Sequence, residues 1–233
     1  MREVDLMNLN YCRKFTILPI NIVLVGSLFA SGHFFLLPAL SSELVDNHEI
    51  SQVEQQLRVE KLLRLITQRL LIAHDVARWK WNKKQAIEDI KREQELLSKL
   101  GQEAIKYGLD ADTVTNFFQA QITASKLIQT ADFQKWQQQG IKSFDDVPDL
   151  NQSIRPSLDQ LNTEFLSVLA KLKPVLGCPA MKEIIKSRAE IIIRGNGINQ
   201  TVQKLTISPL LDIKSTACHS PNYSVLKHQL QNS

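Results

Sequence analysis

The chain has 233 residues, of which 43% are hydrophobic, and a formal net charge of +4 at pH 7. This length and apolar content are sufficient for one sizeable core, and the abundance of Leu, Ile, Ala, Gln and Lys beside only 8 Gly favours an all-helical fold. So mild a positive charge argues against nucleic acid as a partner.

The first 41 residues have the pattern of a signal peptide. Arg13 and Lys14 precede an apolar run that continues to Leu40, and small residues close the run at a plausible cleavage site. Because the run is longer than most signal cores, an uncleaved membrane anchor is the alternative. We therefore predict an export segment in residues 1–41, a single domain over 42–233, a periplasmic or secreted location, and contact with a membrane only through the export segment.

A bundle of about five to six helices with a long first helix is predicted after the export segment. Apolar spacings of three and four and the positions of Gly, Pro and capping residues set the expected bounds. The helices are expected at 44–82, 86–107, 110–139, 158–176 (starting near Pro156) and 179–194. Residues 140–149 are expected to form a polar connection, and no element is predicted beyond Ile198.

The predicted first helix carries two cations on an apolar side. Arg69, Ala73, Val76 and Lys80 follow one another at spacings of three and four, so at about 100° per residue they share nearly one face. A charge on such a face is costly unless an anion meets it. We therefore expect either a protein carboxylate or an anionic ligand beside Arg69 and Lys80.

Charged residues open the second predicted helix. Asp89, Arg92 and Glu93 are spaced i, i+3 and i+4 and project from one side. Alone, this spacing is typical of an ordinary salt-bridge cluster on a surface.

The third predicted helix places polar groups in line with apolar ones. Phe118, Ile122, Ser125 and Gln129 fall at i, i+4, i+7 and i+11. A ligand pocket and a buried hydrogen bond between helices explain this row equally well. Further on, Arg155 stands just before a proline near a helix N-terminus, where the free N–H groups favour an anion. A solvated loop arginine is the alternative there.

Motifs for covalent or cofactor chemistry do not occur in the sequence. It has no nucleophile elbow, phosphate-binding glycine loop, dinucleotide motif or His-activated serine. The histidines show no ligand spacing, so no metal site is predicted. The remaining four cations, Ser, Gln and two carboxylates suit a small polyanion that bears a hydroxyl, without the activating partners that acid–base or covalent catalysis requires.

Two late cysteines, Cys178 and Cys218, remain as an even pair once Cys12 is lost with the export segment. In an oxidising compartment we expect them to form a disulfide that contributes on the order of 3 to 4 kcal/mol. Two free buried thiols are the alternative.

In their order and spacing these residues resemble the all-helical chorismate mutases. The likeness covers about residues 55–175, and the export segment and the paired cysteines are similar to the exported, monofunctional subclass. The residues that carry the likeness are Arg69, Lys80, IEDIKRE with Asp89, Arg92 and Glu93, and FFQAQITASKLIQ with Ser125 and Gln129. The resemblance implies a chorismate mutase type II-like fold.

It also implies an enzyme that converts chorismate to prephenate by an intramolecular Claisen rearrangement, without a cofactor. Arg69 is similar to the arginine that grips a substrate carboxylate, with Ser125 as a nearby hydroxyl donor. Lys80 resembles the lysine that meets the enolpyruvyl carboxylate and the ether oxygen. Gln129 resembles the group that donates to that same oxygen.

The remaining residues take roles around these by the same resemblance. Asp89 and Glu93 resemble the contacts to the ring hydroxyl. Arg92 matches a further catalytic cation, and Arg155 resembles the last arginine, which in the exported subclass comes from the same chain. The family also implies a homodimer.

Two other functions remain compatible with the sequence. One is a non-catalytic periplasmic bundle that binds an anionic metabolite or a protein partner. The other is a membrane-anchored adaptor with a coiled coil, against which the polar Ser125 and Gln129 argue.

Overall fold

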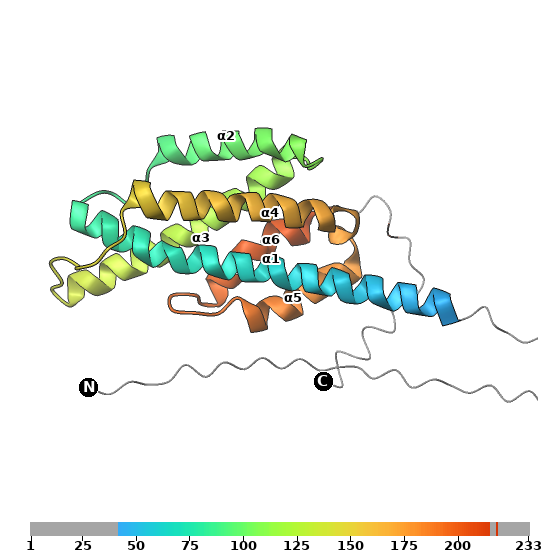
Figure 1. Cartoon of the computed structure of the whole chain (residues 1–233). Helices are drawn as coiled ribbons and strands as arrows, with labels where there is room; N and C mark the ends of the chain where they lie inside the picture. Colours follow the sequence, from blue (N-terminus) through green and yellow to red (C-terminus); the bar gives the residue numbers. More distant parts are fainter. Residues whose placement is uncertain (1–41, 215–217, 219–233) are drawn as a thin grey trace, which may run out of the picture. The chain divides into compact units, whose positions relative to one another are not determined.

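The structure is a computed structural model that describes residues 42–214 and Cys218, and every regular element in these residues is helical (Figure 1). The all-helical prediction is confirmed. The predicted export segment, residues 1–41, lies outside the described residues. Across the described part of the chain, no helix combines the length and the apolarity needed to cross a membrane. The elements are α1 (Ser42–Lys83), α2 (Ile90–Lys106), α3 (Ala111–Gln138), the π-helix η1 (Leu150–Ile154), α4 (Arg155–Leu176), α5 (Pro179–Ile192) and α6 (Gln200–Asp212).

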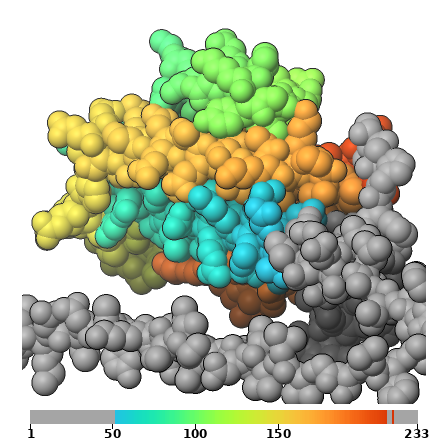
Figure 2. Space-filling view, turned by 45° about the vertical axis from the view of Figure 1, so that its right-hand side comes forward, coloured from blue at the N-terminus to red at the C-terminus, as the bar shows by residue number. Residues whose placement is uncertain are grey.

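The long helix α1 is the centre of the bundle. It contacts α3, α4 and α5, while α2 packs on α3, and α6 packs on α3 and α5 (Figure 1). On the face that Figure 2 shows, α4 lies between α1 and α2. Leucines and isoleucines of α1 recur at helical spacing and are fully buried, namely Leu62, Leu63, Ile66 and Leu70. Burial of each such side chain is worth about 1.5 to 3 kcal/mol, so this stripe explains why α1 is central.

Three phenylalanines fasten α3 to α4. Phe117 and Phe118 on α3 and Phe165 on α4 are almost completely buried, with ring centroids 5.3 to 5.7 Å apart in edge-to-face arrangements. Edge-to-face packing matches the positive ring edge to the negative ring face. These ring contacts join α3 to α4, and both helices also contact α1.

The start of α2 differs from the sequence prediction. The helix begins at Ile90 and not at Ala86, because Asp89 is its N-cap and its carboxylate accepts from the backbone N–H of Arg92 at 3.2 Å. Before it, Lys84 adopts a φ of 52°, which ends α1 and turns the chain. The connection brings Ile87 and Asp89 back over the C-terminal end of α1.

Helix α4 begins close to Pro156, as predicted, and follows a short element that was not predicted. The polar connection is followed by η1, whose N-cap Asp149 accepts from the backbone N–H groups of Asn151 and Gln152, both at 2.8 Å. Helix α4 then starts at Arg155, with Pro156 in its first turn, where a missing N–H costs nothing. Arg155 is therefore a helical residue, and its interpretation as a solvated loop arginine is wrong.

Helix α6 occupies the part of the chain for which no element was predicted. Asn199 caps it by accepting from the backbone N–H of Val202 at 3.0 Å. Val202, Ile207 and Leu210 are buried. The pattern is short and contains Pro209, which obscures its helical character in the sequence.

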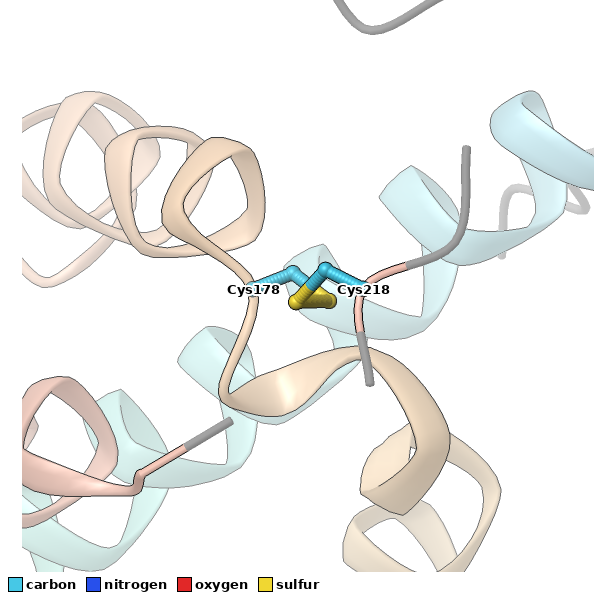
Figure 3. The surroundings of a disulfide bond; sticks show 2 residues. All are labelled: Cys178 and Cys218. Carbon is cyan, nitrogen blue, oxygen red and sulfur yellow. A yellow bond between two sulfur atoms is a disulfide. The ribbon is translucent and has the colours of Figure 1, made fainter. Parts of the chain in front are cut away.

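The predicted disulfide between Cys178 and Cys218 is present, with the two Cα atoms 5.6 Å apart (Figure 3). Cys178 is the N-cap of α5 and is buried. The bond therefore ties the chain that follows α6 to the start of α5 and closes a loop with a sequence separation of 40.

Candidate active site

Side chains from α1, α2, α3, η1 and α4 enclose a cavity of about 140 Å³. Apolar groups from all five of these elements contribute to its wall, among them Val76, Leu96, Ile122, Leu150 and Leu158. The structure brings every predicted site residue to this one cavity: Arg69, Lys80, Asp89, Arg92, Glu93, Ser125, Gln129 and Arg155. Their roles toward a substrate remain predictions.

Arg69 lines the cavity and is only 5% exposed. Its Nη1 donates to Asn162 Oδ1 at 3.2 Å, and its guanidinium carbon lies 5.9 Å from the ring centre of Phe118. Its buried Nε has no partner among the described residues. Burial lowers the pKa of Arg69 to about 10, opposed by the nearby charge of Asp159. The guanidinium is therefore charged at neutral pH and has donor capacity to spare.

Lys80 lies three turns further along the same side of α1 and is also buried. Its Nζ donates to the backbone carbonyl of Ile87, in the connection before α2. Burial lowers the pKa of Lys80, while the charges of Asp89 and Glu93 act in the opposite direction. The ammonium is thus held beside a neutral oxygen in a water-poor place.

The charged residues at the start of α2 have different hydrogen-bond and ion-pair partners. Asp89 caps the helix, and Glu93 accepts from Lys126 Nζ on α3 at 3.1 Å. The nearest carboxylate to Arg92 is that of Glu95, at 3.9 Å between two substantially exposed side chains, so the pair is weak. Arg92 therefore lines the cavity and also forms a weak surface ion pair, so both interpretations of this cluster apply to it.

Ser125 and Gln129 lie one turn apart on α3 and both line the cavity. Gln129 Nε2 donates to Ser125 Oγ at 3.0 Å, and the buried Oε1 of Gln129 has no partner in the described part of the chain. Because a hydroxyl both donates and accepts, the amide can turn by 180° and accept from Ser125, which directs its NH₂ group elsewhere. The hydrogen bond runs within α3, so the alternative of a bond between helices does not explain this row.

The charges of the cavity are unbalanced. Five cations and three carboxylates line it, which gives a net charge of +2: Arg69, Lys80, Arg92, Lys126 and Arg155 against Asp89, Glu93 and Asp159. Three of the cations donate to neutral oxygens, namely Arg69 to Asn162, Lys80 to the Ile87 carbonyl, and Arg155 to Asn151. Their charge is available to a small, doubly negative ligand.

Three polar residues that line the cavity were not predicted from the sequence, namely Lys126, Asp159 and Asn162. Asp159 and Asn162 follow Arg155 at i+4 and i+7, which places the three on one side of α4. That spacing was a usable signal. The described residues hold no group of three His, Cys, Asp or Glu side chains suited to a metal ion. The cavity therefore offers charge and hydrogen-bond donors, with no activated nucleophile.

Comparisons with known proteins agree with this geometry. The model of the family described as chorismate mutase type II matches residues 60–130. The secreted chorismate mutase of Mycobacterium tuberculosis is 29% identical over 147 residues, which cover 63% of this chain and 73% of that protein. The secreted chorismate mutase of Mycolicibacterium smegmatis is 27% identical over 132 residues, covering 57% and 72%.

A solved structure extends the likeness to three dimensions. The crystal structure of chorismate mutase from Burkholderia phymatum superposes with a TM-score of 0.62 at 25% identity, over 67% of this chain and 97% of that one. The matched segment 60–130 carries seven of the eight predicted site residues, all but Arg155. Family match, relatives and fold thus converge, and the chain is a homologue of the all-helical, type II chorismate mutases and of their secreted members.

Proposed function

We propose that the protein is an exported chorismate mutase, which converts chorismate to prephenate outside the cytoplasm. The observation that carries the proposal is the cavity with a net charge of +2, in which three cations donate to neutral oxygens. Chorismate is a dicarboxylate that bears a ring hydroxyl, so its charge and polar groups complement the cavity. The secreted relatives support the location.

The groups that line the cavity match the requirements of the proposed reaction. A Claisen rearrangement within one molecule needs neither proton transfer nor a covalent intermediate. Catalysis then consists of holding the folded reactive conformer and stabilising the negative charge that develops on the ether oxygen. Cations behind an apolar wall do both, because a charge acts more strongly where water is excluded.

The donors of α1 and α3 act on the reacting atoms. Arg69 and Ser125 bind one carboxylate of chorismate. Lys80 exchanges the Ile87 carbonyl for the enolpyruvyl carboxylate and the ether oxygen, and Gln129 turns its NH₂ group to that same oxygen. Two donors, one on α1 and one on α3, therefore interact with the negative charge that develops on the ether oxygen.

The residues of α2 and α4 complete the enclosure. Asp89 and Glu93 accept from the ring hydroxyl, with Glu93 steadied by Lys126 at 3.1 Å. Arg92 and Arg155 supply the remaining positive charge. Arg155 lines the cavity from its own chain, so this proposal requires no residue from a second subunit. A homodimer is expected from the family, and light scattering on the purified protein tests it.

The decisive experiment follows the loss of chorismate absorbance on adding the purified protein. We expect turnover by the wild type, its loss in Arg69→Ala, and wild-type rates in Arg64→Ala. Arg64 is the matched control because it lies on α1 with a side chain 66% exposed, and its ion pair in the described part of the chain is with Glu60 at 3.6 Å. An inactive wild-type protein that still binds chorismate would favour the non-catalytic binding function instead.

A further inference from the structure

Asn162 on α4 is a buried polar residue with one partner. It is 4% exposed and lines the cavity, and its Oδ1 accepts from Arg69 Nη1 at 3.2 Å. Asn162 lies two turns after Arg155 on the same side of α4. Its amide is thus the fixed contact between α4 and the most buried cation of the site.

A neutral hydrogen-bond acceptor beside Arg69 affects the net charge of the cavity. A buried guanidinium needs hydrogen-bond acceptors, because an unpaired one is costly. A carboxylate is the stronger acceptor and the usual partner of a buried arginine, but it cancels the positive charge. The amide fixes the direction of one N–H bond and leaves the charge of Arg69 intact.

The surroundings of Arg69 agree with an uncancelled charge. The pKa of Arg69 is lowered by burial, and the charge of Asp159 only partly opposes this effect. No carboxylate lies within 4.0 Å of the guanidinium among the residues that the structure describes. The Nε of Arg69 is buried and has no partner within the described segments, so a second N–H group stays available.

We propose that Asn162 is a positioning residue, whose neutral amide holds Arg69 in place without sharing its charge, so that the guanidinium can bind a substrate carboxylate. The inference rests on the proposed function and deepens it. Because the carboxylate is bound both before and during the rearrangement, the contribution of Asn162 belongs to substrate binding.

The test is Asn162→Asp, which keeps the size of the side chain and an oxygen within reach of Arg69. It lowers the net charge of the cavity by one. We expect KM for chorismate to rise at least tenfold with a smaller change in kcat, while the melting temperature stays equal or rises because a buried ion pair has formed. A KM within twofold of wild type overturns the proposal, and the uncharged Asn162→Ala variant separates lost positioning from the effect of the added negative charge.

A second pair of variants separates stability from binding. Asn162→Ala removes the acceptor, and Gln121→Ala removes another buried amide, which donates to the Thr206 carbonyl at 2.9 Å and does not line the cavity. We expect both to lower the melting temperature and only Asn162→Ala to raise KM. An equal KM in these two variants contradicts the proposed positioning.

A binding measurement distinguishes failure of this inference from failure of the proposed function. Malate serves as a probe because it is a dicarboxylate that bears a hydroxyl, and calorimetry gives its Kd without any turnover. An inactive wild-type protein whose malate affinity still falls tenfold in the uncharged variant Asn162→Ala loses the proposed reaction but keeps the role of Asn162. Equal malate binding by wild type and variant, including no binding by either, overturns that role.

Discussion

Replacing Gln129 by Glu tests the donor to the ether oxygen most directly. The amide of Gln129 is 5% exposed and carries no titratable proton, so it donates at every pH. A glutamate at the same place donates only when it is protonated, and its ordinary pKa is about 4.3. We expect Gln129→Glu to lose about 2.7 to 4 kcal/mol of transition-state stabilisation once ionised, or roughly 100- to 1,000-fold in kcat, as for one oxyanion donor.

The sign of the pH dependence follows from whether the new carboxyl group carries a proton. The ionised carboxylate lacks a donor and repels the developing negative charge, so the rate of Gln129→Glu falls about tenfold per pH unit above the pKa of the new carboxyl group. It levels off where the remaining donors, chiefly Lys80, set the rate. Loss of chorismate absorbance between pH 4.5 and pH 8 measures the profile.

The matched control is Gln129→Leu, which removes the donor and adds no titratable group. We expect it to be slow at every pH and to show the same profile shape as the wild type. If Gln129→Glu has a pH profile as flat as that of the wild type, the assignment of Gln129 to the ether oxygen is wrong.

Three further predictions follow from other contacts. Lys80→Ala is expected to lose about 3 to 4 kcal/mol of transition-state stabilisation, and a kcat/KM within about tenfold of wild type would mean that the cavity is misassigned. Reduction of the bond between Cys178 and Cys218 is expected to remove on the order of 3 to 4 kcal/mol of stability, and an unchanged urea midpoint with dithiothreitol would contradict this. The carboxylate of Asp132, 2.6 Å from His74 Nδ1, raises the pKa of His74. The resulting stability is present below the ordinary pKa of about 6.5 and is lost as pH rises through the raised value, so Asp132→Asn should flatten the melting temperature between pH 5.5 and pH 8.5.

The sequence was sufficient to find the two cations of α1 because helical geometry is regular. Arg69 and Lys80 are separated by 11 residues, or three turns, with Ala73 and Val76 between them. In the structure they line the same cavity. Long, strongly periodic helices preserve such spacings, so side chains on one face can be placed before any tertiary contact is known.

That site residues on different helices lie together could be predicted only from the resemblance to the family. Nothing in the spacing of Ser125 or Arg155 indicates that α3 and α4 turn these side chains toward α1. That arrangement depends on the packing of Phe117, Phe118 and Phe165, which is a property of three dimensions. The resemblance to the family predicted that these side chains share one site, and in the structure they line one cavity.

The elements that the sequence missed have weak local signals. Helix α6 has 13 residues and contains Pro209, and its burial against α3 supplies the stability that its own sequence lacks. The start of α2 was misplaced because Ala86 is a good helix former, whereas the side chain of Asp89 determines the actual cap. Both errors concern tertiary contacts or caps that override local propensity.

The neutral partners of the cations explain how one fold is both stable and functional. If Arg69, Lys80 and Arg155 were each paired with a carboxylate, the empty cavity would be more stable, but a dianion would have to displace three ion pairs. Amides and a backbone carbonyl each accept one hydrogen bond from these cations without cancelling their charge. The buried apolar side chains of α1 and the disulfide lie outside the cavity. They contribute stability that offsets the remaining electrostatic cost. On the proposed function, a bound dianion would relieve that cost, so substrate binding and the electrostatic cost of the cavity would have the same physical origin.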